Sequence, residues 1–523
     1  MMNMRMNILF GGKAGQGINE LSIMIGKVAT NLGYWVFNYK DYQSLIRGGH
    51  NFNVLCISDK PIKSYDNKID LLVALDQNTI EFHKDELSDK NEIISEEIIN
   101  SRGLIREHKL DKKVVNAIYA GSVIKKLGIE LNELESVFNE NFSGEILKHD
   151  ILAAKLGNEL VEEKYSLKKV GDKKYFINGN YGIAIGAIAS GLDIYFAYPM
   201  SPATTILHDL AKKQIEYNYV VHQPENELGA INNTIGAAFA GAKTFTSTSG
   251  GGFDLMSETL SLQGISEIPL VVALIQRQGP GTGAPTYTSQ GDLNAALYSG
   301  HGDFSRILIA PGDAKECIEL TNQAFYLSYK FGLLSIILSD KHLAEDMICF
   351  EKPPEILDVK DRNHPNYPGK TIVKATSYEH LPNKETTEDP IEIKKGIERR
   401  LEKIKDYEKE IENFKTTKIY GNGKNLIIGF GSTKGAILDS LDELNAKFLQ
   451  ILYLEPFPKD KVKKMIEDSQ DFIVVENNVV GQLSDLITKH TGIIIPKEKR
   501  LLKYDAMPFT PHDIVNSLVR WKK

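Results

Sequence analysis

Short apolar runs alternate with amphipathic helical stretches along most of the chain, and this alternation predicts the fold. The run 268–275 (IPLVVALI) has the length of a buried strand, while 6–33 combines an apolar strand, a glycine loop and an amphipathic helix that stops at Gly33. Strands that alternate with helices usually form mainly parallel sheets covered by helices on both faces. The pattern therefore predicts an α/β fold with doubly wound, mostly parallel sheets.

Breaks in the alternation indicate three domains. The polar segment 161–174 ends the first one, and the pattern lapses again after Cys349. Within this lapse, 391–414 is expected to form a charged helix with a thin apolar stripe, which indicates packing or subunit contact. A chain of 523 residues is also too long for one core. We expect a first domain, a central domain, a connecting segment and a smaller C-terminal domain at residues 1–165, 175–350, 351–422 and 423–523.

Charge, cysteine content and hydropathy narrow the class of protein. The 62 basic and 69 acidic residues leave a net charge of −7, which gives no reason to expect nucleic acid as a partner. Cys56, Cys317 and Cys349 are far apart and form no ligand set for zinc or an iron–sulfur cluster, so any cluster is expected on another chain. Apolar runs stay well short of the roughly 20 residues that span a bilayer. The first residues run into a strand without leader architecture, so we expect a cytoplasmic protein without membrane contact or metal ligands.

The glycine loop 12–17 (GKAGQG) leaves alternatives open. One alternative is a dinucleotide site, because the amides at a helix N-terminus attract phosphate. The glycines fall as GxxGxG and not as GxGxxG, and the acidic residue expected downstream is at best Asp41. A tight turn between strand and helix, or a site for another phosphate, competes with NAD binding. Further along, Arg47 and His50 flank a glycine pair, and they either face an anionic ligand or form a solvated turn.

Residues 179–288 contain four polar loops punctuated by glycine or proline, each next to an apolar run. Because the carboxyl ends of parallel strands meet at one edge of a sheet, these loops are expected to share a crevice where a ligand binds. Together the loops supply four functional groups. The groups are a hydroxyl, a carboxylate in an otherwise apolar helix, a guanidinium beside glycines and a second hydroxyl, from Ser201, Glu227, Arg277 and Thr286.

As a set, these loops resemble those of the 2-oxoacid:ferredoxin oxidoreductases, thiamine diphosphate enzymes that oxidatively decarboxylate 2-oxoacids. The segment 198–202 (YPMSP) is similar to the family's YPITP motif. Other similar segments, in the same order, are SLIRGGHNF, GNYGIAIGA, ENELGAINNTIGA, TSTSGGG, QRQGPGTGAPT, TSYEH with TTEDP, VVENN, GQL and LLKYDAMPFTP. The chain resembles the α subunit with the γ domain fused at its front. This implies a γ-type first domain, a central thiamine pyrimidine-binding-type domain and a transketolase C-terminal-like domain.

The resemblance implies that Glu227 is the family's activating glutamate, which promotes loss of the C2 proton of thiamine through the aminopyrimidine. The residues that follow Glu227 are nearly uncharged and would desolvate its carboxyl. Glu225 lies two residues away and competes for the role. Alternatively, Glu227 only occupies a helix N-terminus, where acidic residues are favoured. By the same resemblance, Pro199 and Ser249 also contact the cofactor.

For the substrate, Arg277, Ser201 and Thr286 match positions that contact the oxoacid in the family, and Tyr198 belongs to the same motif. A guanidinium can hold a carboxylate through two parallel hydrogen bonds, and the glycines beside Arg277 allow a ligand to approach closely. A solvated loop arginine is the alternative. Ser201 replaces the threonine common in the motif and Met200 replaces isoleucine, which leaves the size of the oxoacid open.

The resemblance also implies a partner chain. The sequence shows no GDG-plus-Asn arrangement for Mg²⁺ and pyrophosphate, and in the family that site and a 4Fe-4S cluster belong to the β subunit. We therefore expect thiamine diphosphate to be shared with a β subunit in an αβ or (αβ)₂ complex. Coenzyme A is the expected cosubstrate and ferredoxin the electron acceptor. Candidates for binding coenzyme A or covering the site are Gly15, Gly17, Arg47 and His50.

The predicted function is that of the α subunit of a 2-oxoacid:ferredoxin oxidoreductase. 2-Oxoglutarate is favoured because the fused γ–α layout resembles that branch, and pyruvate or a broad range of oxoacids is the alternative within the family. An NAD-dependent dehydrogenase that uses loop 12–17 and a non-catalytic scaffold are the alternatives from other classes. The presence of Glu227, Arg277 and Thr286 argues against a scaffold.

Overall fold

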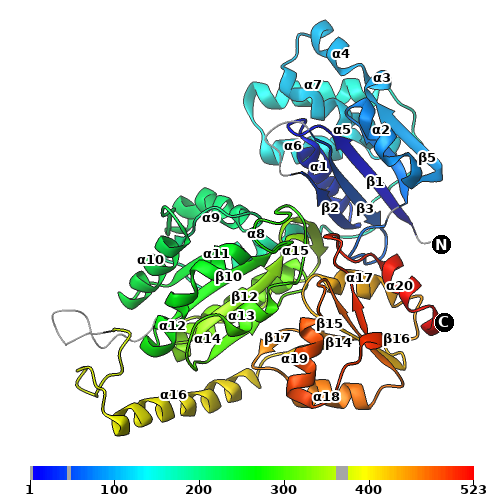
Figure 1. Cartoon of the computed structure of the whole chain (residues 1–523). Coiled ribbons are helices and arrows are strands. Elements are labelled where there is room, and N and C mark those ends of the chain that lie inside the picture. The colour runs from blue at the N-terminus through cyan, green and yellow to red at the C-terminus, as the bar shows by residue number, and fades with distance from the viewer. Residues whose placement is uncertain (1–3, 44–48, 67, 361–374, 523) are drawn as a thin grey trace. The chain divides into compact units, whose positions relative to one another are not determined.

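The computed structural model describes residues 4–43, 49–66, 68–360 and 375–522. They divide into two compact units of mixed α/β structure (Figure 1). The first unit contains the chain up to residue 177 with 346–352 and 510–512, and the second contains 178–345, 353–509 and 513–523. The three-domain division suggested by the sequence stays a proposal.

The first unit is built on a seven-stranded sheet. Its strands are β1 (Arg5–Gly12), β2 (Trp35–Asp41), β3 (Asn51–Ser58), β4 (Ile69–Ala74), β5 (Leu87–Ser95), β6 (Tyr175–Asn178) and β13 (Met347–Phe350), in the order β5-β4-β1-β3-β2-β13-β6. β1 is parallel to β4 but antiparallel to β3, and β2 is antiparallel to both β3 and β13. The centre of this sheet is therefore antiparallel. The apolar runs could not predict this, because they indicate that a strand is buried but not which way it runs.

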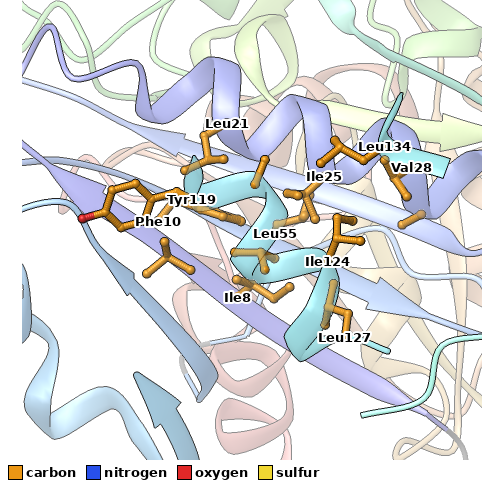
Figure 2. Close-up of a cluster of buried hydrophobic side chains, with 14 of the residues drawn as sticks. Ile8, Phe10, Leu21, Ile25, Val28, Leu55, Tyr119, Ile124, Leu127 and Leu134 are labelled. Carbon is orange, nitrogen blue, oxygen red and sulfur yellow. The ribbon is translucent and has the colours of Figure 1, made fainter. Parts of the chain in front are cut away.

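Helices α1 (Ile18–Asn31) and α5 (Val115–Lys126) contribute to one hydrophobic core with the strands of this sheet (Figure 2). On α1, Leu21, Ile25 and Val28 recur at helical spacing, so one side of the helix is buried. Ile8 and Phe10 on β1 alternate toward the same core. The other helices of the unit are α2 (Gln77–His83), α3 (Glu96–Ile99), α4 (Ser101–Glu107), α6 (Leu131–Asn141) and α7 (Gly144–Asn158).

The second unit contains a seven-stranded sheet that carries the central loops. Its strands are β7 (Ile194–Phe196), β8 (Val220–His222), β9 (Thr244–Thr248), β10 (Leu270–Gln276), β11 (Arg306–Ile309), β12 (Leu334–Asp340) and β17 (Tyr453–Glu455), in the order β17-β11-β12-β10-β9-β7-β8. All neighbours from β11 to β8 are parallel, and only β17 at one edge of this sheet is antiparallel. The parallel sheet predicted for the centre of the chain is confirmed.

Helices connect these parallel strands and cover the sheet (Figure 1). They are α8 (Gly179–Ala189), α9 (Thr204–Tyr217), α10 (Glu227–Phe239), α11 (Gly250–Leu255), α12 (Ser257–Ser266), α13 (Leu293–Tyr298), α14 (Ala314–Phe331) and α15 (Lys341–Glu345). The predicted charged helix is α16 (Pro390–Ile411). Asp389 caps it by accepting hydrogen bonds from the amides of Ile391 and Glu392 at 2.8 and 3.2 Å.

A five-stranded sheet completes the second unit. It consists of β14 (Thr417–Tyr420), β15 (Asn425–Gly429), β16 (Ala446–Ile451), β18 (Phe472–Glu476) and β19 (Arg500–Leu502), in the order β14-β16-β15-β18-β19. Its helices are α17 (Thr433–Ser440), α18 (Lys459–Glu467), α19 (Gln482–Thr491) and α20 (Pro511–Ser517). Side chains of both sheets, such as Leu274 and Leu338 with Ile428 and Leu449, belong to one buried cluster. This shared core explains why the two sheets form one unit.

Candidate active site

The candidate site lies at the carboxyl edge of the parallel sheet. β10, β9, β7 and β8 are consecutive neighbours that run in the same direction, so the loops that follow them leave from one edge. Three of the four segments singled out in the sequence supply these loops, whereas the fourth, 179–191, forms the helix α8 and is not a loop. The expected common edge is therefore present.

Glu227 is the first residue of α10, directly after the N-cap Asn226, whose side chain accepts a hydrogen bond from the amide of Gly229 at 2.8 Å. The Glu227 side chain is buried, with 4% of the residue's surface exposed. Its Oε1 has no hydrogen-bond partner among the residues that the structure describes. A buried carboxylate oxygen without a partner is costly, so this atom is suited to a ligand. Glu225, the competing candidate, is exposed.

Gly252 lets the turn after β9 approach Glu227 closely. A Cβ atom added at Gly252 would lie 2.8 Å from Glu227 Oε1 and would also clash with Thr248 Oγ1. Ser249, the N-cap of α11, is fully buried, and its Oγ lacks a hydrogen-bond partner in the described part of the chain. Two unpartnered oxygen atoms, from Glu227 and Ser249, thus lie at the glycine turn 249–252.

The loop after β7 carries Tyr198, Pro199 and Ser201. Tyr198 is 38% exposed, while Pro199 and Ser201 are partly buried. Met200 Sδ lies 3.9 Å from Thr248 Oγ1, which joins this loop to the end of β9. The loop that the resemblance assigned to the substrate therefore adjoins the turn that contains Ser249.

Arg277 follows β10 directly and reaches across to the loop after β7. Its Nη1 donates a hydrogen bond of 2.8 Å to the backbone carbonyl of Ser201. The guanidinium is partly buried, and burial lowers the pKa of Arg277, while the negative charge of Asp292 opposes the shift. Arg277 is therefore a partly desolvated cation fixed on one side by the protein.

Thr286 lies at the end of the glycine-rich loop 278–286. The backbone of Gln278 pairs with Ala284 and Tyr287, and Gly283 has a φ of 54° where an added Cβ would clash with the carbonyl of Gln278. Thr286 itself is buried, at 4% exposure. Within the described ranges, no hydrogen bond joins its side chain to Ser201, Glu227 or Arg277.

Asp292 is a charged residue of this site that the sequence argument missed. Burial raises its pKa to about 6, the charge of Asp254 adds to the shift, and Arg277 opposes it. Its Oδ2 is buried, without a hydrogen-bond partner in the part of the chain that the structure describes. The signal available in the sequence was an acidic residue that follows the glycine loop and precedes an apolar helix.

The remaining candidates belong to the first unit. Loop 12–17 is a tight turn between β1 and α1, in which the Lys13 amide donates to Gln16 Oε1 at 2.5 Å. Gly15 and Gly17 have φ angles of 90° and 75°, which glycine adopts without strain. Arg47 lies outside the described residues.

His50 of the first unit is turned toward another histidine. Its Nε2 lies 2.8 Å from Nε2 of His83, and His83 Nδ1 lies 2.7 Å from Glu86 Oε2. Burial lowers the pKa of His50, and the neighbouring His83 lowers it further. One ring nitrogen of His50 is thus already engaged within the protein.

No helix in the described ranges is both long and apolar enough to cross a membrane. Among the same residues, no group of three or more histidine, cysteine, aspartate or glutamate side chains is placed to hold a metal ion. The three cysteines are buried, and no disulfide bond joins them.

Family models identify the chain as an α/β oxidoreductase with a thiamine diphosphate-binding domain. Residues 185–414 match the family model described as pyruvate flavodoxin/ferredoxin oxidoreductase, thiamine diphosphate-binding, and residues 7–160 match that of pyruvate ferredoxin/flavodoxin oxidoreductase. The 2-oxoacid:ferredoxin oxidoreductase α subunit of Sulfolobus sp is 30% identical over 99% of this chain and 97% of its own length. The chain belongs to the family of 2-oxoacid:ferredoxin oxidoreductase α subunits, as the resemblance of its motifs implied.

Two further relatives are informative. The 2-oxoglutarate synthase subunit KorA of Archaeoglobus fulgidus is 32% identical over 59% of this chain and 88% of its own length. The solved 2-oxoglutarate:ferredoxin oxidoreductase from Magnetococcus marinus, with 2-oxoglutarate, coenzyme A and succinyl-CoA bound, is 25% identical. It superposes with a TM-score of 0.86 and covers 99% of both chains.

Proposed function

We propose that this α subunit catalyses the oxidative decarboxylation of 2-oxoglutarate to an acyl-CoA and CO₂, with two electrons passed to ferredoxin through a β subunit. Membership of the family supports the reaction class. The relatives named for 2-oxoglutarate support the substrate, and the Magnetococcus marinus structure with coenzyme A bound supports the acyl acceptor. Pyruvate or a broad range of oxoacids is the alternative within the family.

The observation that carries the proposal is the buried, unpartnered Oε1 of Glu227 beside Gly252. An aminopyrimidine ring offers a nitrogen that can share a proton with such a carboxyl group, and Gly252 leaves room next to it. Glu227, Ser249 and Pro199 would hold this half of thiamine diphosphate. When bound, the cofactor would supply a carbon nucleophile suited to the ketone of a 2-oxoacid. Glu227 holds and moves the proton at Oε1 that this activation requires.

The residues proposed for the oxoacid act by charge and hydrogen bonding. Arg277 binds the carboxylate next to the ketone, because its Nη1 bond to the Ser201 carbonyl leaves the other guanidinium donors for the ligand. The hydroxyls of Ser201 and Thr286 donate to substrate oxygens, and Tyr198 closes the exposed side. Partial burial strengthens these interactions, since less water competes for them.

The rest of the reaction is assigned to a partner. A β subunit would supply Mg²⁺, the pyrophosphate site and a 4Fe-4S cluster, within an αβ or (αβ)₂ complex. In the first unit, Gly15, Gly17, Arg47 and His50 are proposed to bind coenzyme A or to cover the site. The Arg47→Ala variant tests this role through the KM for coenzyme A, which we expect to rise. An unchanged KM would contradict it.

Purification of the chain with its β subunit, followed by assays of an oxoacid panel with a viologen acceptor, tests the proposed function. We expect turnover that requires both thiamine diphosphate and coenzyme A, with the highest kcat/KM for 2-oxoglutarate. A higher kcat/KM for pyruvate or a branched-chain oxoacid would favour the alternative substrate. Turnover without thiamine diphosphate would contradict the proposed chemistry.

A further inference from the structure

Asp292 is tied to the strand end that carries Arg277. Its amide donates a hydrogen bond of 2.9 Å to Oε1 of Gln276, the last residue of β10 and the direct neighbour of Arg277. Gln276 is fixed in turn, because it is 1% exposed and its Nε2 donates to the Ser339 carbonyl at 3.2 Å. The backbone of Asp292 is therefore held at a defined place beside the guanidinium-bearing loop.

The carboxyl of Asp292 packs against the glycine turn of the site. A Cβ atom added at Gly250 would lie 2.8 Å from Asp292 Oδ2 and 3.3 Å from its Cγ. A Cβ atom added at Gly252, two residues further, would likewise lie 2.8 Å from Glu227 Oε1. Two carboxyl groups thus adjoin one glycine turn, and each has a buried oxygen without a partner in the described part of the chain.

Two charged groups shift the pKa of Asp292, and Arg277 is the cation of the two. Asp254, exposed on α11, adds a negative charge, whereas Arg277 adds a positive one. From α19, the neutral Gln482 amide donates to the Gly291 carbonyl at 2.6 Å, and its Oε1 accepts from the Asn294 amide at 2.8 Å. No hydrogen bond or ion pair joins Asp292 to Arg277 in the described ranges, so their interaction acts through space.

We propose that Asp292 is a positioning residue that sets the charge presented by Arg277 to an anionic substrate. A 2-oxoacid carboxylate bound at Arg277 draws one proton from solvent onto the Asp292 carboxyl. An O–H bond forms on Asp292, no bond of the oxoacid breaks in this step, and the proton returns to solvent when the carboxylate leaves. This inference rests on the oxoacid site proposed above.

Asp292 takes up the proton because it is costly to hold two anions near one partly buried cation. With Asp292 ionised, its charge cancels part of the field of Arg277 and repels the carboxylate of the substrate. With Asp292 protonated, Arg277 acts with its full charge. Because burial raises the pKa of Asp292 to about 6, the carboxyl can take up a proton near neutral pH once a second anion is bound.

The test measures oxoacid KM against pH in the complex with the β subunit, for the wild type and the Asp292→Asn variant. We expect the wild-type KM to rise above about pH 6, by up to about tenfold per pH unit, the limit for one coupled proton. The Asp292→Asn profile should be flat and lie below that of the wild type at alkaline pH. As a control, Glu258→Gln removes the charge of an exposed carboxylate on α12 and should keep the wild-type dependence of KM on pH.

A second readout counts the proton directly. Titration calorimetry of 2-oxoglutarate into the complex freed of thiamine diphosphate, in buffers of different ionisation enthalpy, should show uptake of up to one proton for the wild type near pH 7 and none for Asp292→Asn. A flat wild-type KM profile, or an uptake that the variant retains, would overturn the inference. Because Arg277→Ala tests the oxoacid site itself, the two proposals can fail separately.

Discussion

Arg277 donates a hydrogen bond of 2.8 Å from its Nη1 to the backbone carbonyl of Ser201, although the two residues lie 76 positions apart in the chain. The bond spans β9, which separates β10 from β7 in the sheet. It holds a guanidinium, which carries a permanent charge, against the loop that resembles the family's substrate-binding motif.

Replacing Arg277 by alanine should raise the KM for the oxoacid, with a penalty on the order of 2–4 kcal/mol for the lost ionic clamp. Arg277→Lys keeps the charge but loses the planar pair of donors, so it should fall between wild type and alanine. Steady-state kinetics of the complex measure both. Arg520→Ala removes an arginine whose side chain is 58% exposed and should leave KM unchanged. Unaltered oxoacid affinity in Arg277→Ala would refute the assigned role.

Glu227→Gln should leave the complex assembled and suppress turnover by about 10²-fold or more, the scale of positioned acid–base catalysis. Glu225→Gln is the matched control, because Glu225 is exposed two residues away and should keep turnover near that of the wild type. Size-exclusion chromatography and viologen reduction report assembly and rate. If Glu225→Gln were the impaired variant, the two residues would exchange roles.

Gly252→Ala should impair both turnover and stability. The new methyl group would lie 2.8 Å from Glu227 Oε1 and would clash with Thr248 Oγ1, so the turn or the carboxyl has to move. Overpacking of this kind costs about 1–3 kcal/mol. Gly251→Ala makes the same change at the neighbouring helical position, where nothing lies within 4 Å, and should preserve both properties. Equal behaviour of the two variants, in thermal unfolding and kcat, would argue against a cradle at Gly252.

Lys434→Met should destabilise the second unit strongly. Lys434 is 4% exposed and contacts both Asp313 and Glu316, and Glu316 Oε1 lies 2.6 Å from its Nζ. Removing the buried cation breaks both ion pairs at a cost of about 3–5 kcal/mol, although Lys418 Nζ still lies 2.7 Å from Glu316 Oε1. The exposed pair of Lys394 with Glu398 provides the control, since Lys394→Met should leave the unfolding midpoint nearly unchanged. Similar midpoints for the two variants would show that the buried network adds little.

Stability of the first unit should fall at mildly acidic pH through His50. Burial and the neighbouring His83 lower the pKa of His50 in the folded chain, so the unfolded chain, with a pKa of about 6.5, binds the proton more tightly. The contribution of neutral His50 to the free energy of unfolding is complete above about pH 6.5 and is lost as the pH falls below that value. Thermal unfolding of the wild type and His50→Asn between neutral and acidic pH should show a smaller acid loss in the variant. His108→Asn, at an exposed position, should retain the wild-type dependence.

The sequence by itself determined the α/β class and the edge at which the site lies. Apolar runs such as 268–275 became the buried strand β10, and the polar loops after parallel strands had to leave from one edge. It also supplied the motifs from which the family could be recognised. Local pattern suffices here because burial and helical spacing are properties of neighbouring residues.

Only the tertiary structure decided which acid is buried and which groups act on one another. Glu225 and Glu227 are the same residue type two positions apart, and the structure shows that Glu227 is buried whereas Glu225 is exposed. Asp292 stayed unnoticed because the residues around it, Gly250 after β9 and Gln276 and Arg277 at the end of β10, are distant from it in the sequence. The antiparallel pairing of β1 with β3 was equally hidden. Contacts of this kind depend on chain paths between distant residues, and hydrophobic periodicity carries no information about those paths.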